Sequence, residues 1–180
     1  AATVAEDGAI EGYASFFGVA DQGGDVVEAG AFARSLAALK AAGRSVKLLW
    51  QHDPAEPIGV WDLVAEDARG LRVKGRLLRE VSRGAEALAL LRAGAVDGLS
   101  IGYRATKATR RPGGGRLLSE IELWEVSLVT FPMLPAARAA ASARAEGGPA
   151  ERNGDDEGGE GAALTALAGA LGEARRRWGA

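Results

Sequence analysis

Few side chains in this sequence could take part in acid–base or nucleophilic chemistry, because it holds a single histidine, His52, and no cysteine. The lack of cysteine excludes a disulfide framework, a zinc–thiolate site and a cysteine nucleophile. A single histidine likewise excludes any multi-histidine metal site. General-base catalysis near neutral pH therefore depends on one imidazole, whose ordinary pKa suits that role.

A candidate nucleophile lies in the segment Gly98-Leu99-Ser100-Ile101-Gly102, which matches the G-x-S-x-G pattern of a nucleophile elbow. The elbow of the α/β-hydrolases needs a strand-to-helix turn and the chain order serine, acid, histidine. Here the residues after Ser100 favour a strand and His52 precedes the serine, so an α/β-hydrolase such as an esterase is disfavoured. A serine hydrolase with the order histidine, serine, acid remains open, as does a structural serine in a Gly-flanked strand.

His52 follows an apolar segment and starts the turn signal His52-Asp53-Pro54, a place where a side chain can face a cleft. A serine hydroxyl needs a base beside it, and the base needs an acid that fixes its tautomer. Asp53 is a poor partner for His52, because adjacent residues of an extended chain point to opposite faces. A lone histidine with a structural or surface role is the alternative.

Glu125 is the acid that we expect to orient His52. It lies between Trp124 and Val126 in an apolar segment, where a carboxylate needs a partner to remain charged. Glu120 and Glu122 fall near the start of the same segment and are expected on a solvated face. For Glu125 the alternative is an edge-strand carboxylate that points to water.

The elements that would position these residues are mainly strands. We expect an α+β fold in which a compact, mainly antiparallel sheet or barrel has helices packed outside it. A Gly- and Asp-containing loop is expected at 18–30. The expected strands are 10–17, 46–51, 58–64, 71–78, 99–106 and 117–129, and the expected helices are 31–42 and 81–92.

Composition predicts one soluble domain followed by a tail. The 180 residues are 47% apolar, with 22 Lys plus Arg against 24 Asp plus Glu, a net charge of −2 that does not call for nucleic acid or an acidic membrane. No apolar run approaches the roughly 20 residues that span a bilayer, and no signal segment opens the chain. We expect a protein that is not exported.

The predicted domain covers residues 1–138 and the predicted tail residues 139–180. The tail is mostly Ala, Gly, Arg and acidic residues, and its stretch 146–161 is expected to be a flexible linker. Residues 162–178 carry Leu164, Leu167 and Leu171 at helical spacing, which predicts a short docking helix. An Ala-rich tail with only transient helicity is the alternative.

Four segments occur in an order that resembles a known family, the prohead maturation proteases of tailed phages and of phage-derived gene transfer agents. The resemblance covers about residues 10–137 and includes Pro132 and Pro135. The segments are Asp25-Val26-Val27-Glu28-Ala29-Gly30-Ala31-Phe32, Leu48-Leu49-Trp50-Gln51-His52-Asp53, Gly98-Leu99-Ser100-Ile101-Gly102-Tyr103 and Glu122-Leu123-Trp124-Glu125-Val126-Ser127-Leu128-Val129.

The resemblance implies a serine endopeptidase of the herpesvirus assemblin type, a β-barrel ringed by helices. The family's histidine falls on His52 and its serine on Ser100. The assemblins carry a second histidine in a histidine-valine-alanine-leucine pattern, to which Glu125-Val126-Ser127-Leu128 is similar, so the third role falls on Glu125. The assemblins also have an arginine pair soon after this strand, and no such pair follows Thr130 here.

The function that the resemblance implies is cleavage of the capsid protein's scaffolding segment, or of a separate scaffold, followed by self-cleavage. Such an enzyme would act in the cytoplasm inside a procapsid and needs no metal or cofactor. Its expected partners are the major capsid protein and its scaffolding segment, with no nucleic acid or membrane, and self-association stays open. The alternative function is a non-catalytic scaffold or internal capsid component on the same fold.

Overall fold

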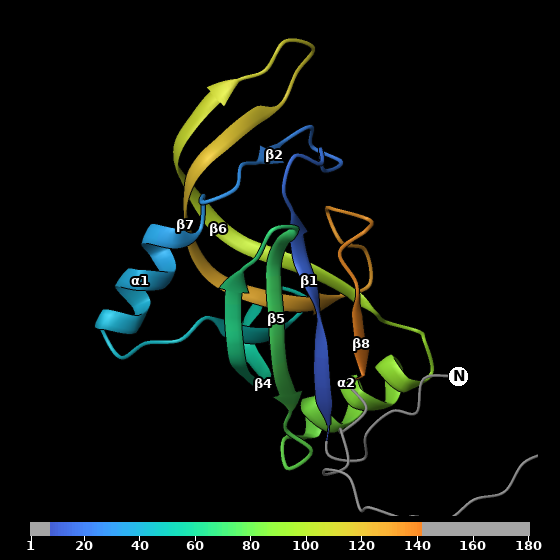
Figure 1. The fold of residues 1–180 in the computed structure, drawn as a ribbon. Helices are drawn as coiled ribbons and strands as arrows, with labels where there is room; N and C mark the ends of the chain where they lie inside the picture. The colour runs from blue at the N-terminus through green and yellow to red at the C-terminus, as the bar shows by residue number, and fades with distance from the viewer. Residues whose placement is uncertain (1–7, 142–180) are drawn as a thin grey trace, which may run out of the picture. The chain divides into compact units, whose positions relative to one another are not determined.

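The computed structural model describes residues 8–141, which form a mixed β-sheet with two short helices (Figure 1). The β6–β7 hairpin reaches well beyond the other strands in this view, and α1 lies beside β7. In chain order the elements are β1 (Ala9–Phe16), β2 (Val26–Val27), α1 (Ala33–Ala41), β3 (Lys47–Trp50), β4 (Asp53–Glu66), β5 (Gly70–Leu77), α2 (Ser82–Arg92), β6 (Gly98–Arg110), β7 (Arg116–Val129) and β8 (Ala139–Ala141).

The sheet has the strand order β2-β7-β3-β4-β5-β1-β8, with β6 paired to the other edge of β7. β2 and β3 pair with β7 in parallel, and the other ladders within residues 8–141 are antiparallel. β2 and β3 run in the same direction along one edge of β7, and the segment that contains α1 connects them. Both strands therefore pair with β7 in parallel. The prediction of a mainly antiparallel barrel is therefore corrected to a mixed sheet whose ladders do not close.

The predicted strands and helices match the observed ones within a few residues, except for three differences. β4 begins at Asp53, earlier than expected, and β2 lies inside the segment predicted as a loop. β8 covers Ala139–Ala141, the first residues of the predicted tail, and pairs with β1. The rest of that tail, including the predicted linker and helix, lies outside the described residues.

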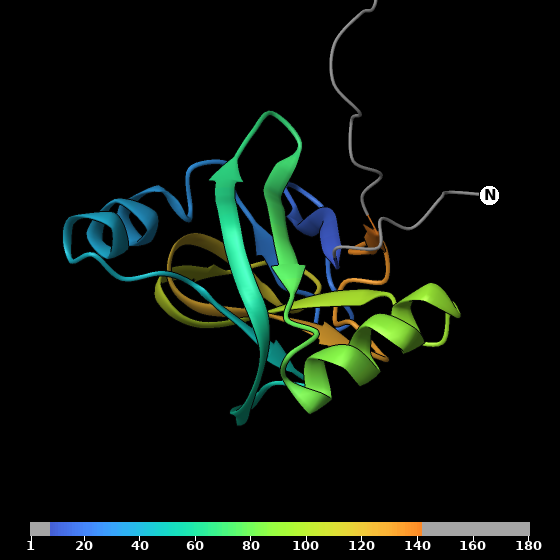
Figure 2. The same cartoon turned by 90° about the horizontal axis from the view of Figure 1, so that it is seen from below.

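The two helices cover different parts of the sheet and lie far apart (Figure 2). Ahead of α1, the ring of Phe32 is fully buried, and in α2 the residues Ala87, Leu88 and Leu91 pack inward against β4 and β5. No helix within residues 8–141 is long and apolar enough to span a membrane.

The segment around β2 is joined to β7 by hydrogen bonds and an ion pair. Asp25 accepts hydrogen bonds from the backbone N–H of Arg116 at 2.8 Å and from its guanidinium at 2.5 Å. The backbone N–H of Glu28 donates to Leu118 O, and the backbone N–H of Ile121 donates to Ala31 O. These contacts connect the first of the four ordered segments to the first half of β7.

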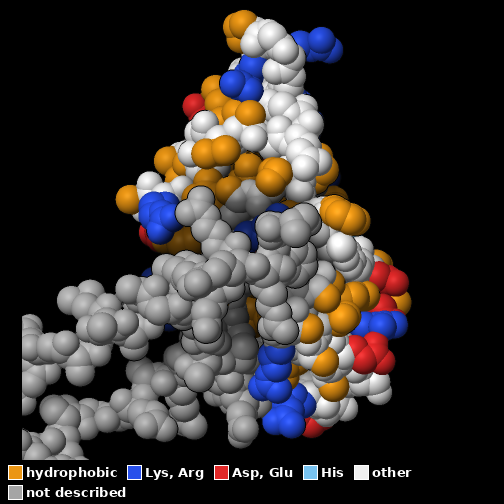
Figure 3. All heavy atoms as spheres, turned by 90° about the vertical axis from the view of Figure 1, so that its right-hand side faces the viewer, with side chains coloured by type: hydrophobic (Ala, Val, Ile, Leu, Met, Phe, Trp, Pro, Cys, Tyr) orange, Lys and Arg blue, Asp and Glu red, His pale blue; other side chains and the backbone are white. Residues whose placement is uncertain are grey.

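Several large apolar side chains stay exposed beside the end of β7. Phe131 is 89% exposed and Met133 is 50% exposed, while Val19 lies in the loop that follows β1. The backbone N–H of Gln22 donates to Met133 O, so this loop and the segment after β7 are adjacent. Figure 3 shows hydrophobic side chains gathered below the basic tip of the β6–β7 hairpin on the face turned toward the viewer.

Candidate active site

His52 sits in a two-residue turn between β3 and β4. Trp50 pairs with Asp53, so Gln51 and His52 form the loop, and both have positive φ values, 51° and 64°. Positive φ at both loop residues is the signature of a type I′ hairpin turn, which usually selects Asn and Gly. The turn signal expected at residues 52–54 therefore lies one residue earlier and places the imidazole at its tip.

The end of β7 holds this turn in its uncommon conformation. The backbone N–H of Gln51 donates to Leu128 O at 3.0 Å. Its side-chain amide donates to Thr130 Oγ1 at 2.7 Å and accepts from the backbone N–H of Thr130 at 3.2 Å. Backbone strain of this kind persists where surrounding contacts overdetermine it, and such places cluster at active sites.

Glu125 reaches the site because β7 contains a β-bulge. Ile121 and Leu123 face the core ahead of the bulge, and Val126 and Leu128 face it afterwards, which a regular two-residue alternation does not allow. Gly102 pairs with Glu125 and Tyr103 with Leu123, so Trp124 is the extra residue. The bulge thus turns Glu125 away from the core while Leu123 and Val126 on either side remain buried.

His52 and Glu125 are in direct contact. The Nδ1 atom of His52 lies 2.5 Å from Oε1 of Glu125, whose side chain is largely buried, whereas the imidazole is 42% exposed. The other carboxylate oxygen accepts a 2.5 Å hydrogen bond from Ser127 Oγ. Ser127 Oγ in turn accepts from the backbone N–H of His52 at 3.2 Å. Turn and carboxylate therefore share one buried hydroxyl as a support.

The carboxylate makes His52 more basic. The hydrogen bond to Glu125, with the attraction between the two charges, raises the pKa of His52 above its ordinary value of 6.5. Partial burial of the ring acts in the opposite direction but is the smaller influence on the pKa than the hydrogen bond. With a proton on Nδ1 facing the carboxylate, Nε2 is the nitrogen left to accept a proton from a nucleophile.

Ser100 lies on β6, the strand next to β7, and on the same face of the sheet as Ser127. It pairs with Ser127 across the β6–β7 ladder, and side chains of directly paired residues point to one side. Ser100 is 5% exposed and lines a cavity of about 230 Å³. Within residues 8–141 no direct hydrogen bond joins Ser100 to His52, so the two are neighbours across Ser127 rather than in contact.

The two glycines that flank Ser100 are required by close approaches. A Cβ atom on Gly102 would lie 2.1 Å from Oε1 of Glu125, and one on Gly98 would lie 2.6 Å from Val129 O. Gly102 therefore leaves the space that the carboxylate occupies. The G-x-S-x-G pattern falls at the start of β6 rather than at a strand-to-helix elbow.

Two residues of this site were not found from the sequence. Ser127 is fully buried and Gln51 holds the turn. The two-residue spacing from Glu125 could have placed Ser127 beside it, but nothing in the sequence marks Gln51. In the part of the chain that the structure describes, no three His, Asp or Glu side chains gather in a metal-binding arrangement.

Comparison with known proteins agrees with the resemblance noted in the sequence. The model of the family described as caudovirus prohead serine protease matches residues 1–148. The chain belongs to this family. The match includes each of the ordered segments that carried the resemblance, so the expected family is confirmed.

One phage prohead protease resembles this chain in sequence, and a phage capsid assembly protease resembles it in fold. The chain is 39% identical over 131 residues to the prohead protease of Enterobacteria phage HK97, which covers 71% of this chain and 56% of that protein's length. The capsid assembly protease of bacteriophage T4 shares the fold with a TM-score of 0.57 at 16% identity, over 67% of this chain and 80% of that one. The KSHV protease bound to a hexapeptide phosphonate inhibitor superposes with a TM-score of 0.44 at 13% identity, over 73% and 63% of the two chains.

Proposed function

We propose that this chain is a serine endopeptidase of head maturation, with Ser100 as nucleophile, His52 as general base and Glu125 as the residue that orients His52. The observation that carries the proposal is the 2.5 Å contact between His52 Nδ1 and Glu125 Oε1. A carboxylate on Nδ1 selects the tautomer whose Nε2 can accept a proton, which is the arrangement that hydrolytic triads use.

In the proposed reaction these side chains carry out the nucleophilic attack and the proton transfers. Ser100 attacks the scissile carbonyl while His52 takes its proton, and His52 then delivers that proton to the leaving amine. Water hydrolyses the acyl-enzyme by the same proton transfers in reverse. The separation of Ser100 and His52 in the uncomplexed chain is compatible with this role, because catalytic hydrogen bonds often tighten only when substrate binds.

The proposed substrates are the scaffolding segment of the major capsid protein, or a separate scaffold, and the chain itself. The site of action is then the inside of the procapsid. Family membership supports this proposal, as does the shared fold with a capsid assembly protease. Self-cleavage would fall in the Gly- and acid-rich stretch 146–161, a sequence expected to be accessible to a protease.

We propose that the fold is an incompletely closed barrel of the herpesvirus-protease type, built from a mixed rather than a mainly antiparallel sheet. The approach of β8 to the start of β6 supports it. Gly98 and Arg138 form an isolated bridge, the backbone N–H of Leu99 donates to Ala137 O, and that of Ala139 donates to Asp97 O.

Co-expression with the cognate capsid protein tests the function. Mass spectrometry should show trimmed capsid protein with the wild-type chain and intact capsid protein with Ser100→Ala or His52→Ala. Each of these two substitutions should reduce turnover by a factor on the order of 10⁴ to 10⁶. Glu125→Gln should cost about 10² to 10⁴, because orientation is a supporting role.

Glu120→Gln and Glu122→Gln are the matched controls for the acid, since both lie on β7 outside the His52 contact. Impaired processing in either control with normal processing in Glu125→Gln would assign the acid elsewhere. Processing that persists in folded Ser100→Ala would refute the serine mechanism. Capsid assembly that depends on the chain while nothing is cleaved would favour a non-catalytic scaffold.

A further inference from the structure

A groove of about 740 Å³ lies between α1 and the exposed face of the β6–β7 hairpin. We call it the basic groove, and the residues that matter for it are Arg34, Arg44, Lys47, Arg104, Lys107 and Trp124. Two carboxylates, Glu120 and Glu122, also line it, so five cationic side chains face two anionic ones. The catalytic proposal uses none of these residues.

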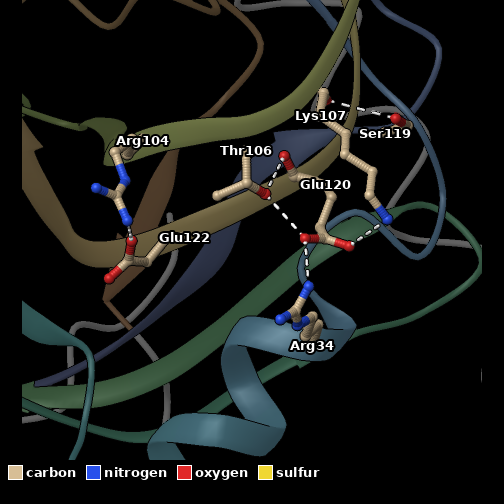
Figure 4. Close-up of polar contacts among 7 residues, drawn as sticks. All are labelled: Arg34, Arg104, Thr106, Lys107, Ser119, Glu120 and Glu122. Carbon is tan, nitrogen blue, oxygen red and sulfur yellow. Dashed lines mark hydrogen bonds and ion pairs between the residues drawn. The ribbon is translucent and has the colours of Figure 1, made fainter.

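Both carboxylates of the basic groove already have partners (Figure 4). Glu120 is held between Arg34 and Lys107, each at 3.0 Å, and Thr106 Oγ1 also donates to it. Hydrogen bonds from Lys107 and Thr106 lower the pKa of Glu120, so it remains ionised. Glu122 binds Arg104 at 2.6 Å. These glutamates offer no free negative charge to the other cations.

Arg44 and Lys47 are the surplus cations. Both are exposed, and within residues 8–141 neither has a carboxylate within salt-bridge distance. They lie close together in the chain at the start of β3, on one wall of the groove. Next to them Trp124, the bulged residue of β7, is 53% exposed and offers an apolar surface.

The basic groove adjoins the candidate active site at Glu125. Lys47 pairs with Glu125 across the parallel β3–β7 ladder, and Trp124 precedes Glu125 in β7. A polypeptide held at Ser100 and running along this face would therefore pass from the catalytic residues directly over Lys47 and Trp124. Side chains of a substrate a few residues from the scissile bond would enter the groove.

The charge pattern favours an acidic peptide over nucleic acid. Three of the five cations are already paired with Glu120 and Glu122, and those carboxylates would repel a run of phosphates. The two surplus cations suit one or two carboxylates of an extended chain, and an exposed indole suits the apolar side chains between them. We infer that the basic groove binds an acidic segment of the substrate polypeptide flanking the scissile bond; this rests on the proposed function.

Peptide binding to the full-length Ser100→Ala chain tests this inference without any cleavage. The probes are a fluorescent decapeptide of alternating Glu and Ala and its Gln-for-Glu counterpart, measured by anisotropy at low salt. The Glu peptide should bind at least about fivefold more tightly than the Gln peptide. Adding Arg44→Gln/Lys47→Gln to the Ser100→Ala chain should remove that preference. The control Lys40→Gln/Arg110→Gln makes the same change of net charge outside the groove and should keep it.

Three outcomes would overturn the inference: equal binding of the two peptides, a preference that survives Arg44→Gln/Lys47→Gln, or a preference lost equally in the control. Tighter binding of an oligothymidylate of twelve nucleotides, lost in the same groove variant, would make the groove a nucleic-acid site instead. If the Glu peptide binds as expected while the wild-type chain cleaves no capsid protein, the proposed function is refuted. The binding of acidic peptides by the basic groove is then still supported. In active enzyme, Arg44→Gln/Lys47→Gln should raise KM for an acidic substrate and leave kcat unchanged.

Discussion

Gly102 and Glu125 face each other across the β6–β7 ladder so closely that a Cβ atom on Gly102 would lie 2.1 Å from the carboxylate oxygen that contacts His52. The carboxylate therefore lies over the bare backbone of the neighbouring strand. This relationship connects the strand that carries Ser100 with the acid that orients His52, because the glycine two residues after the serine makes room for that acid.

Gly102→Ala should impair catalysis by displacing Glu125. We expect a loss of turnover on the order of 10² or more, similar to Glu125→Gln, with a smaller loss of folding stability of about 1–3 kcal/mol from overpacking. The measurement is a double-mutant cycle with Glu125→Ala, scored by capsid processing. In the Glu125→Ala background the Gly102→Ala change should have little further effect. Additive losses would show that Gly102 acts on something other than Glu125.

The raised pKa of His52 predicts the pH dependence of activity. A general base must be neutral, so kcat/KM should increase with pH through an apparent pKa above the ordinary 6.5 of histidine. Glu125→Gln removes the largest cause of the increase and leaves partial burial, which lowers the pKa. Its acidic limb should therefore move to lower pH, although its maximum rate is smaller. An acidic limb at the same pH in Glu125→Gln and the wild type would show that Glu125 does not set the pKa of His52 in the active enzyme.

The same shift has a consequence for stability with the opposite dependence on pH. Because folded His52 binds its proton more tightly than it does in the unfolded chain, the pair with Glu125 stabilises the fold below about pH 6.5. That contribution is lost as the pH rises through the folded-state pKa. Urea denaturation of the wild type and His52→Gln at pH 5 and pH 8 should show the larger difference at pH 5. The difference should be small, since the imidazole is partly exposed.

Ser127 is expected to act as a positioning residue. Its hydroxyl donates a hydrogen bond to Glu125 and accepts one from the backbone N–H of His52. Ser127→Ala therefore removes the hydrogen-bond donor of one buried carboxylate oxygen. A hydrogen bond to a charged group is worth about 1.5–3 kcal/mol, which corresponds to a loss of about tenfold to a hundredfold in turnover. Ser119→Ala, an exposed serine of the same strand, is the control. A shifted acidic limb would distinguish loss of Glu125 alignment from simple destabilisation.

Much of the fold follows from local patterns in the sequence. Strands such as β5 and β7 and both helices were predicted from the spacing of apolar residues, within a few residues of their bounds. β2 and β8 were missed because each is short and depends on a partner strand rather than on its own composition. Parallel pairing of β3 with β7 was missed for a related reason, since strand order is a tertiary property that no local pattern encodes.

The candidate site was predictable in its residue types but not in its geometry. His52, Ser100 and Glu125 were chosen from motif order, and the structure brings His52 to Glu125. The bulge at Trp124 could not be foreseen, because it appears in the sequence only as a break in alternation. Likewise the type I′ turn contains Gln51 and His52 rather than Asn and Gly, so the usual turn residues gave no signal. The catalytic roles remain a proposal.

The boundary of the folded domain should lie beyond Ala141 rather than at Arg138. β8 pairs with Ile10, Glu11 and Gly12 of β1, so a chain that ends at Arg138 loses this ladder, whereas one that ends at Ala145 keeps it. Urea denaturation should show the chain 1–138 to be less stable than the chain 1–145 by about 1–3 kcal/mol, at about 1 kcal/mol for each hydrogen bond lost. The chain 1–145 should match the full chain within about 0.5 kcal/mol, because residues 146–180 offer few large apolar side chains. Equal stability of 1–138 and 1–145 would place the boundary at Arg138, and unfolding of 1–145 would make the tail part of the fold.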